Sequence, residues 1–310
     1  MNQLHVVIGA GPVGWTVAEQ LAAQGHSVRI LTRSGSGPDH PAIERHRVDI
    51  ETDDLTDEFA GATAIYLCTH VAYQNKVWRE KLPAMEQRVL DAAAGTVVVF
   101  PESLYSYGKV DGPIREDSPR TATHRKLGVR TLLLAARDAH RTPTVSVAAS
   151  DFYGPRVRTS HMGERIVPKV TAGKSVSVIA KADVPHSFTY IPDFAAAMIA
   201  AGARKDLWNT FLHAPTAPAV TQRRMIELFA DAARVPVPTV TAIPAWIVRA
   251  LGVVPGQMKE LGDTLYQFQY PYVLDSTRSD TLLGLHPTPL DDGTAATVAW
   301  WNAEELTPTS

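Results

Sequence analysis

The amino-acid sequence predicts an α/β fold: a doubly wound, mostly parallel sheet followed by a smaller mixed lobe at the C-terminal end. A short apolar run at 6–8 leads into a glycine-rich turn and then a helical pattern. Short β-branched runs and helical patterns then alternate as far as residue 148. From about residue 150 this alternation stops, and Pro and Gly become frequent. Such alternation is typical of a parallel sheet covered by helices on both faces.

The first strand, turn and helix predict a dinucleotide-binding, Rossmann-type unit. The turn reads GAGPVG, the following helix ends at Gly25, and a second strand follows at 28–31. Gly9 permits the tight turn, Gly11 lets backbone N–H groups approach a pyrophosphate, and Gly14 lets the helix pack against the strand. The phosphates would lie at the positive end of that helix. We therefore expect the cofactor to contact Gly9, Gly11, Pro12, Val13 and Gly14.

The end of the second strand indicates which nucleotide binds. A site selective for NAD usually has Asp or Glu about 20 residues after the turn, where it binds the ribose 2′-hydroxyl. Here the strand ends Thr32-Arg33-Ser34, and no carboxylate follows before Asp39. Arg33 offers a cation and planar N–H donors to a 2′-phosphate, and Thr32 and Ser34 add hydroxyls. NADP(H) is the predicted cofactor; the alternative is that Arg33 is a solvated loop residue.

Later elements of this half supply further candidate contacts. We expect a strand at 47–50 to bring Asp49 to the adenine ring, although a turn or helix cap is an equal alternative. The fourth strand, 64–67, is followed by Cys68, Thr69 and His70, and the carboxyl ends of strands in a doubly wound sheet face the cofactor crevice. His70 would contact the ligand or be an ordinary loop residue. Tyr73 would form a pocket wall or pack in the core.

The remaining elements divide the chain into two domains. Helices are expected at 53–61, 76–94 and 123–141, and strands at 96–100 and 144–148. We place an NADP-binding Rossmann domain at 1–155, to which 186–213 returns, and a substrate-binding lobe at 156–310. In the lobe, 221–233 reads as an amphipathic helix capped by Thr221, and a last helix carries Trp300 and Trp301.

Composition limits the partners. A net charge of −2 over 310 residues gives no reason to expect nucleic acid or an anionic membrane. Cys68 is the single cysteine, so no disulfide framework forms within the chain, and the histidines lack metal-ligand spacing. No apolar run approaches the ~18 residues of a membrane span, and the first strand begins at once. We expect a cytoplasmic protein with a small-molecule substrate and no metal.

In several ordered pieces the sequence resembles the extended short-chain dehydrogenase/reductase superfamily, which includes NAD(P)-dependent epimerases and dehydratases. After the glycine turn come Tyr107-Gly108 following the fifth strand, Tyr153-Gly154-Pro155 following the sixth, and 190–193 (YIPD) before a helix. The resemblance runs from about residue 4 to 300. It implies a nicotinamide cofactor and, through helices 76–94 and 123–141, a homodimer as one option.

The resemblance breaks at the family's catalytic pair. In the family, a Ser or Thr four residues before Tyr-Gly polarises the substrate carbonyl, and Ser103 occupies that position. A Tyr-x-x-x-Lys pair on the next helix normally supplies the proton and binds the nicotinamide ribose. This chain has no such pair: either Ala122 and Lys126 or Lys126 and Arg130 stand there, and the second register needs no deletion after Pro119. Either way, the customary proton donor is missing.

Other residues must then do its work. Candidates are Ser103 as an oxyanion donor, Lys126 as an acid beside Arg130, and Tyr105 or Tyr107 pointing into the crevice. The plain alternative for Lys126 and Arg130 is a solvated helix face. The loops and lobe supply further candidate substrate contacts, and ordinary packing is the alternative for each. These candidates are Tyr73, Tyr153, His161, His186 and an aromatic lid of Met258, Tyr266, Phe268 and Tyr270.

These features lead first to an NADPH-dependent, ketoreductase-like oxidoreductase that reduces a carbonyl of a small organic substrate, an aromatic one included. The second hypothesis is an NAD(P)-dependent nucleotide-sugar epimerase or dehydratase, against which the missing Tyr and Arg33 both count. The third is a redox sensor that binds NADP(H) without turnover.

Overall fold

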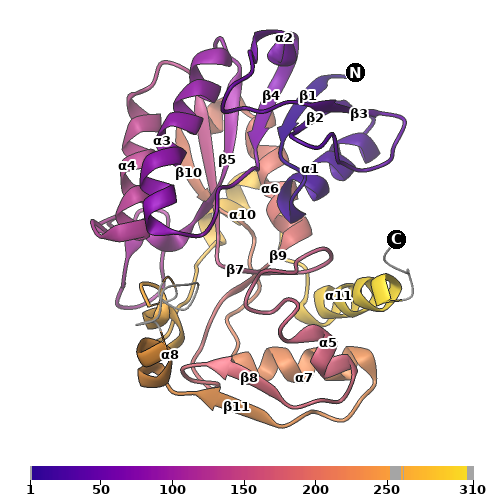
Figure 1. Ribbon diagram of the computed structural model, residues 1–310, viewed down its shortest axis with the longest axis vertical. Coiled ribbons are helices and arrows are strands. Elements are labelled where there is room, and N and C mark those ends of the chain that lie inside the picture. The colour runs from indigo at the N-terminus through magenta and orange to yellow at the C-terminus, as the bar shows by residue number, and fades with distance from the viewer. Residues whose placement is uncertain (1, 252–259, 261, 306–310) are drawn as a thin grey trace.

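A computed structural model describes residues 2–251, 260 and 262–305. Figure 1 shows a larger part built on a broad sheet, with a smaller lobe below it that holds α5, α7 and α11. No helix in the described ranges is long and apolar enough to cross a membrane.

The larger part is built on a seven-stranded sheet in which every pairing is parallel. Its order is β10-β6-β5-β4-β1-β2-β3, which is the doubly wound order with one further strand at the β6 edge. The predicted Rossmann-type fold is confirmed. The strands are β1 Leu4–Ile8, β2 Ser27–Thr32, β3 Ile43–Arg47, β4 Ala62–Leu67, β5 Val97–Ser103, β6 Thr144–Ala149 and β10 Thr210–His213.

Helices cover both faces of this sheet. Alternate residues of the central strands form two separate apolar cores, because successive strand side chains point to opposite faces. Val7 and Val99 face α1 (Pro12–Ala23) and α6 (Ile191–Ala203). Ile8 and Val98 face α3 (Asn75–Ala92) and α4 (Arg125–Ala139), and Figure 1 shows these two helix pairs on opposite sides of the strands. The short α2 spans Thr56–Phe59.

Two strand boundaries differ from the sequence prediction, and both affect the site. The expected strand at 47–50 is wrong: β3 is Ile43–Arg47, paired in register with β2 from Val28 to Thr32. Its side chains are largely polar because it is an edge strand, which hides it from a hydrophobic pattern. β5 runs on to Ser103 and passes directly into the 3-10 turn η1 (Leu104–Tyr107), so Ser103 stands at a strand end.

The lobe is built around a two-stranded parallel sheet of β8 (Val176–Ile179) and β11 (Val240–Ile243). Its core packs α5 (Val167–Thr171), α7 (Gln222–Ala233) and α11 (Leu290–Glu305) together. The predicted cap of α7 is confirmed, since Thr221 Oγ1 accepts a hydrogen bond of 3.0 Å from Arg224 N. The remaining elements are β7 Asp151–Tyr153, β9 Phe188–Tyr190, η2 Lys205–Leu207, α8 Ala245–Leu251, η3 Leu265–Phe268 and α10 Thr277–Leu283.

Candidate active site

Two cavities meet at the carboxyl ends of the sheet strands. The outer cavity, of about 850 Å³, lies over the ends of β2 and β3. The inner cavity, of about 560 Å³, lies between the ends of β4, β5 and β6 and the lobe. Gly9, Ala10, Thr69 and His70 line both. One elongated ligand could therefore run from one cavity into the other past the glycine turn.

The glycine turn is held open by close backbone contacts. Gly9 has a φ of +100°, and a Cβ there would lie 2.8 Å from backbone atoms of Thr69. A Cβ on Gly14 would lie 2.0 Å from the carbonyl oxygen of Gly9, so only glycine lets α1 approach this closely. A Cβ on Gly11 would meet nothing within 4 Å, which leaves free space beside the N-terminus of α1. This geometry fits a bound pyrophosphate.

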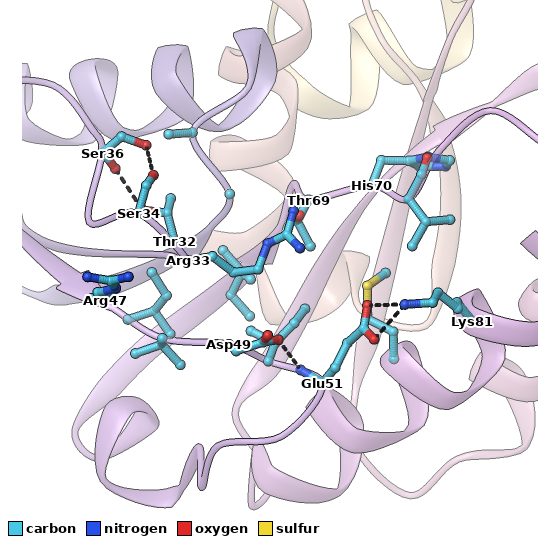
Figure 2. Close-up of a pocket in the computed structure, with 18 of the residues that line it drawn as sticks. Thr32, Arg33, Ser34, Ser36, Arg47, Asp49, Glu51, Thr69, His70 and Lys81 are labelled. Carbon is cyan, nitrogen blue, oxygen red and sulfur yellow. Dashed lines mark hydrogen bonds and ion pairs between the residues drawn. The ribbon is translucent and has the colours of Figure 1, made fainter. Parts of the chain in front are cut away.

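The outer cavity carries positive charge where the sequence predicts it. Thr32, Arg33 and Ser34 line the cavity, as do Asp49 and Arg47. Figure 2 shows Arg33 and Arg47 reaching it from separate strand ends, with Ser34 and Ser36 alongside. Lys81, by contrast, is paired with Glu51 at 2.8 Å. Within the described part of the chain, neither Arg33 nor Arg47 has a carboxylate partner, so both guanidinium groups face the cavity uncompensated.

The inner cavity has a different lining. The glycine turn forms one wall with Pro12, Val13 and Cys68, and Ser103 and Asp151 come from the ends of β5 and β6. No Lys or Arg occurs among the lining residues that the structure describes. The hydroxyls of Ser150 and Ser160 are buried at this cavity without a protein partner in the same part of the chain, so they are free to bind a ligand.

Asp151 gives the inner cavity a carboxylate held in a fixed position. His186 Nε2 donates to Asp151 Oδ2 at 2.7 Å, and His186 Nδ1 donates to the carbonyl oxygen of Gln267 at 3.1 Å. Burial alone would raise the pKa of Asp151, but the hydrogen bond and charge of His186, with His161 nearby, hold it below its usual value. Asp151 is therefore ionised at neutral pH, and its second oxygen is left for a ligand.

Two phenolic groups also line the inner cavity. Tyr73, after β4, and Tyr105, on η1, have hydroxyl oxygens 3.0 Å apart. Burial raises the pKa of both side chains, so both are protonated at neutral pH. Tyr73 and Tyr105 therefore line the cavity, as two of the sequence alternatives had it, and α4 contains no Tyr-x-x-x-Lys pair.

The profile of the NAD dependent epimerase/dehydratase family matches residues 5–209. The chain belongs to this family. No curated protein sequence matches the chain. Family membership confirms the predicted resemblance to extended short-chain dehydrogenases and supports a nicotinamide cofactor. It favours the epimerase or dehydratase alternative over the ketoreductase that the sequence placed first.

Solved structures of the family share the whole fold. The UDP-glucuronic acid 4-epimerase from Bacillus cereus in complex with NAD superposes with a TM-score of 0.77 at 16% identity, over 97% of this chain and 99% of that one. The Bordetella bronchiseptica enzyme WbmH in complex with NAD+ gives 0.73 at 17% identity, over 97% and 99%. Epimerase Mth375 from Methanothermobacter thermautotrophicus gives 0.78 at 15%, over 98% and 93%. At these identities the likeness establishes the fold alone.

Lys126 does not reach the cavity as the family's Tyr would. It lies in the first turn of α4, whereas Ala122 precedes the helix. Of the two alignments with the family's Tyr-x-x-x-Lys pair, only the one with Lys126 and Arg130 places both positions on the helix. Its side chain is fully buried and donates to the carbonyl oxygen of Glu260 at 2.8 Å and to the Glu260 carboxylate, with Asp263 at 3.7 Å. The expectation of Lys126 as the acid, or as a cofactor contact, is not supported, because its ammonium is fully engaged.

Arg130 belongs to a buried ionic network beneath Ser103. Its Nε lies 3.3 Å from Glu102 Oε1, and its Nη2 donates to His70 Nε2 at 2.6 Å. Desolvation and the charge of Arg130 lower the pKa of His70 to about 4, so His70 is neutral and a poor acid. Arg137 binds the other oxygen of Glu102 at 3.0 Å, and Glu102 accepts a 2.8 Å bond from Ser103 N. Arg130 thus positions the end of β5, and the catalytic role predicted for it is not supported.

Three further predicted contacts lie away from the cavities. Tyr107 is fully buried and bonds His213 Nε2 at 3.0 Å, so its predicted catalytic role is not supported. Tyr153 packs in the lobe core against Gly293, where an added Cβ would lie 2.4 Å from its hydroxyl oxygen. His161 bonds Gln222 at 2.5 Å, and burial lowers its pKa to about 4. His186, 1% exposed, acts on a ligand only through Asp151.

Some site residues escaped the sequence reasoning. Asp151 begins β7, two residues after the end of β6, and Arg47 ends β3 beside the end of β2, so the rule that ligands bind at the carboxyl ends of parallel strands would have found both. Of the expected aromatic lid, Tyr266 lies 6.1 Å from Tyr272 beside the inner cavity, and Phe268 stacks on His186 at 4.8 Å. Tyr270 is 47% exposed. Met258 lies outside the described residues.

Proposed function

We propose that this chain is an NAD(P)-dependent enzyme of the epimerase or dehydratase type, which interconverts a secondary alcohol and a ketone on a small substrate in the inner cavity. One observation carries the proposal: the two cavities join at the glycine turn, and the inner one brings Ser103, Tyr73 and Tyr105 beside it. Ser103 would polarise the substrate oxygen, as the resemblance implies, and the phenols would exchange its proton.

The proposed cofactor is NADP(H). The glycine turn and the N-terminus of α1 would hold the pyrophosphate, and Arg33 and Arg47 the 2′-phosphate. When bound, its nicotinamide ring gives or takes the hydride. Among the described residues the outer cavity offers Asp49 and Glu51 as carboxylates; Lys81 offsets the charge of Glu51. The positive charges on this wall outnumber the negative ones, which supports a nucleotide with an extra phosphate.

The proposed substrate is small, hydroxylated and uncharged. The lining residues of the inner cavity that the structure describes include no cation, and the Asp151 carboxylate would repel a phosphate or carboxylate. The unpartnered hydroxyls of Ser150 and Ser160 suit a polyol or sugar ring. The related epimerase from Bacillus cereus acts on a UDP-sugar, whose diphosphate the inner cavity of this chain has no lining cation to neutralise.

A second candidate is a net NADPH-dependent reductase. Two observations favour it: the pair of free guanidinium groups in the outer cavity, and the raised pKa of both Tyr73 and Tyr105, which keeps them in the proton-donating form. Epimerisation needs the reverse step as well, in which a phenolate accepts the proton of an alcohol.

Following NADPH and substrate conversion together distinguishes the epimerase or dehydratase from the reductase. The purified chain would be incubated with NADPH or NADP+ and a panel of uncharged sugars, polyols and ketones, and both substrate conversion and NADPH would be followed. An epimerase or dehydratase converts substrate with no net change in NADPH, whereas a reductase consumes NADPH in step with product. Tight binding of NADPH without conversion of any compound would contradict both and favour the redox sensor.

A further inference from the structure

We propose that Tyr73 is the proton-transferring residue of this site, that Tyr105 holds it by a hydrogen bond, and that together they replace the tyrosine missing from α4. This inference rests on the proposed function. It assigns the missing acid to a residue between β4 and α3, a segment that the family resemblance gives no such role.

The position of Tyr73 carries the proposal. Its hydroxyl oxygen is 3.0 Å from that of Tyr105, and both side chains line the inner cavity with Ser103. Trp78, 2% exposed, fixes both rings: it meets Tyr73 edge-on at 5.4 Å and stacks with Tyr105 at 6.2 Å. The two phenols therefore form a fixed pair beside the residue that would polarise the substrate oxygen.

Lys126, which stands at the family's tyrosine position in the favoured alignment, lies beneath the ring of Tyr73. Lys126 Nζ lies 4.3 Å from the centre of the Tyr73 ring, within the range of a cation–π contact. A cation at this place stabilises a phenolate on Tyr73, and the carboxylates of Glu260 and Asp263 offset part of its charge. Asp151 and Asp263 also face Tyr73 and favour its protonated form. The Lys126 side chain thus ends beneath the Tyr73 ring, and the Tyr73 side chain lines the inner cavity.

Burial raises the pKa of both phenols, and it raises that of Tyr105 well above its ordinary value. Hydrogen bonds from Tyr105 and Thr264 favour the ionised form of Tyr73, whereas the bond to Tyr73 disfavours ionisation of Tyr105. The other candidate acid, Lys126, is engaged elsewhere, because its ammonium is bound to Glu260.

The proposed proton transfer by Tyr73 conserves atoms and electrons in both reduction and oxidation. For reduction, a nicotinamide cofactor held at the glycine turn would supply the hydride for the new C–H bond at the carbonyl carbon. The second electron pair of the C=O bond moves to oxygen, which takes the proton from Tyr73 Oη and becomes an alcohol. The Tyr73 phenolate keeps the electrons of its O–H bond and is held by Tyr105 until solvent returns a proton. For oxidation, that phenolate accepts the alcohol proton as the hydride leaves.

The test uses Tyr73→Phe and Tyr105→Phe, with Tyr270→Phe as the matched control, because Tyr270 is 47% exposed and lines neither cavity. We expect Tyr73→Phe to lower the rate of substrate conversion by a factor on the order of 10² and Tyr105→Phe by less, with unchanged affinity for NADPH. The control retains the wild-type rate. An active wild type with an equally active Tyr73→Phe would overturn the inference and leave the proposed function standing. A wild type without conversion of any substrate would overturn both.

A second readout needs no turnover. Carbon-13 NMR of ring-labelled tyrosine, with Tyr73→Phe to assign the signal, would follow ionisation of Tyr73 in the full chain. Removing the cation with Lys126→Met should shift that titration to higher pH, because the phenolate loses its nearest positive charge. An unchanged titration in Lys126→Met would contradict the coupling of Lys126 to Tyr73.

Discussion

The outer and inner cavities share four residues at the glycine turn and yet have opposite electrostatic character. The outer cavity presents Arg33 and Arg47 without carboxylate partners among the described residues. The inner cavity presents an ionised Asp151, two neutral phenols and no lining cation in the same part of the chain. An anionic tail on one side and an uncharged reacting group on the other would satisfy both.

The difference shows how the fold separates binding from chemistry. Strand ends at the β2–β3 edge carry the positive charge that the proposed 2′-phosphate needs, and those at β4, β5 and β6 carry neutral donors and one carboxylate. Charged groups do lie near the inner cavity, but Arg130 and Arg137 are paired with Glu102 beneath it. They support the strand end that carries Ser103, and they line an adjoining cavity of about 430 Å³ that shares Ser103, Tyr73 and Tyr105 with the inner one.

The largest expected effect comes from breaking that buried network. Arg137→Met should lower the free energy of unfolding by about 3–5 kcal/mol, because Glu86 is left buried with an unpaired charge and Glu102 loses one of its two arginine partners. Urea denaturation measures this. Arg141→Met, at an exposed position four residues further along the chain, is the control and should change stability little. Equal stability of the two variants would show that the network does not hold the floor of the inner cavity.

A smaller effect tests the charge of the inner cavity itself. Asp151→Asn should raise the affinity for UDP by roughly 5- to 10-fold, about 1 kcal/mol, because it removes a negative charge that faces any diphosphate there. Calorimetric titration of both proteins with UDP measures it. The exposed Asp39→Asn serves as a control for net charge and should leave the affinity as it is. If the wild type bound UDP at least as tightly as Asp151→Asn does, the proposed contrast in charge between the two cavities would be contradicted.

Much of the fold could be predicted from local pattern. The glycine turn, the β-branched strands and the caps each depend on residues close in sequence, so 5–37 and the helix at 221–233 were found within a few residues. β3 was misplaced because an edge strand buries only part of its surface and reads IERHR, which shows no apolar alternation.

The site was predicted less well because its contacts are long-range. Tyr73 meets Tyr105, 32 positions away, and Lys126 meets Glu260, 134 positions away, and no local pattern encodes either pairing. The sequence has no Tyr-x-x-x-Lys pair at α4. It could not show that a phenol from another loop lies above Lys126. By contrast, Arg33 was predicted in its place because it directly follows a recognisable strand.

The central claim is that the outer cavity binds a nucleotide carrying a 2′-phosphate. Fluorescence titration of the purified chain with NADPH and with NADH tests it most directly. Each guanidinium–phosphate contact contributes about 1.5–3 kcal/mol, so we predict that NADPH binds at least about 10-fold more tightly, and that Arg33→Ala removes most of this preference. Equal affinities, or tighter binding of NADH, would contradict the account.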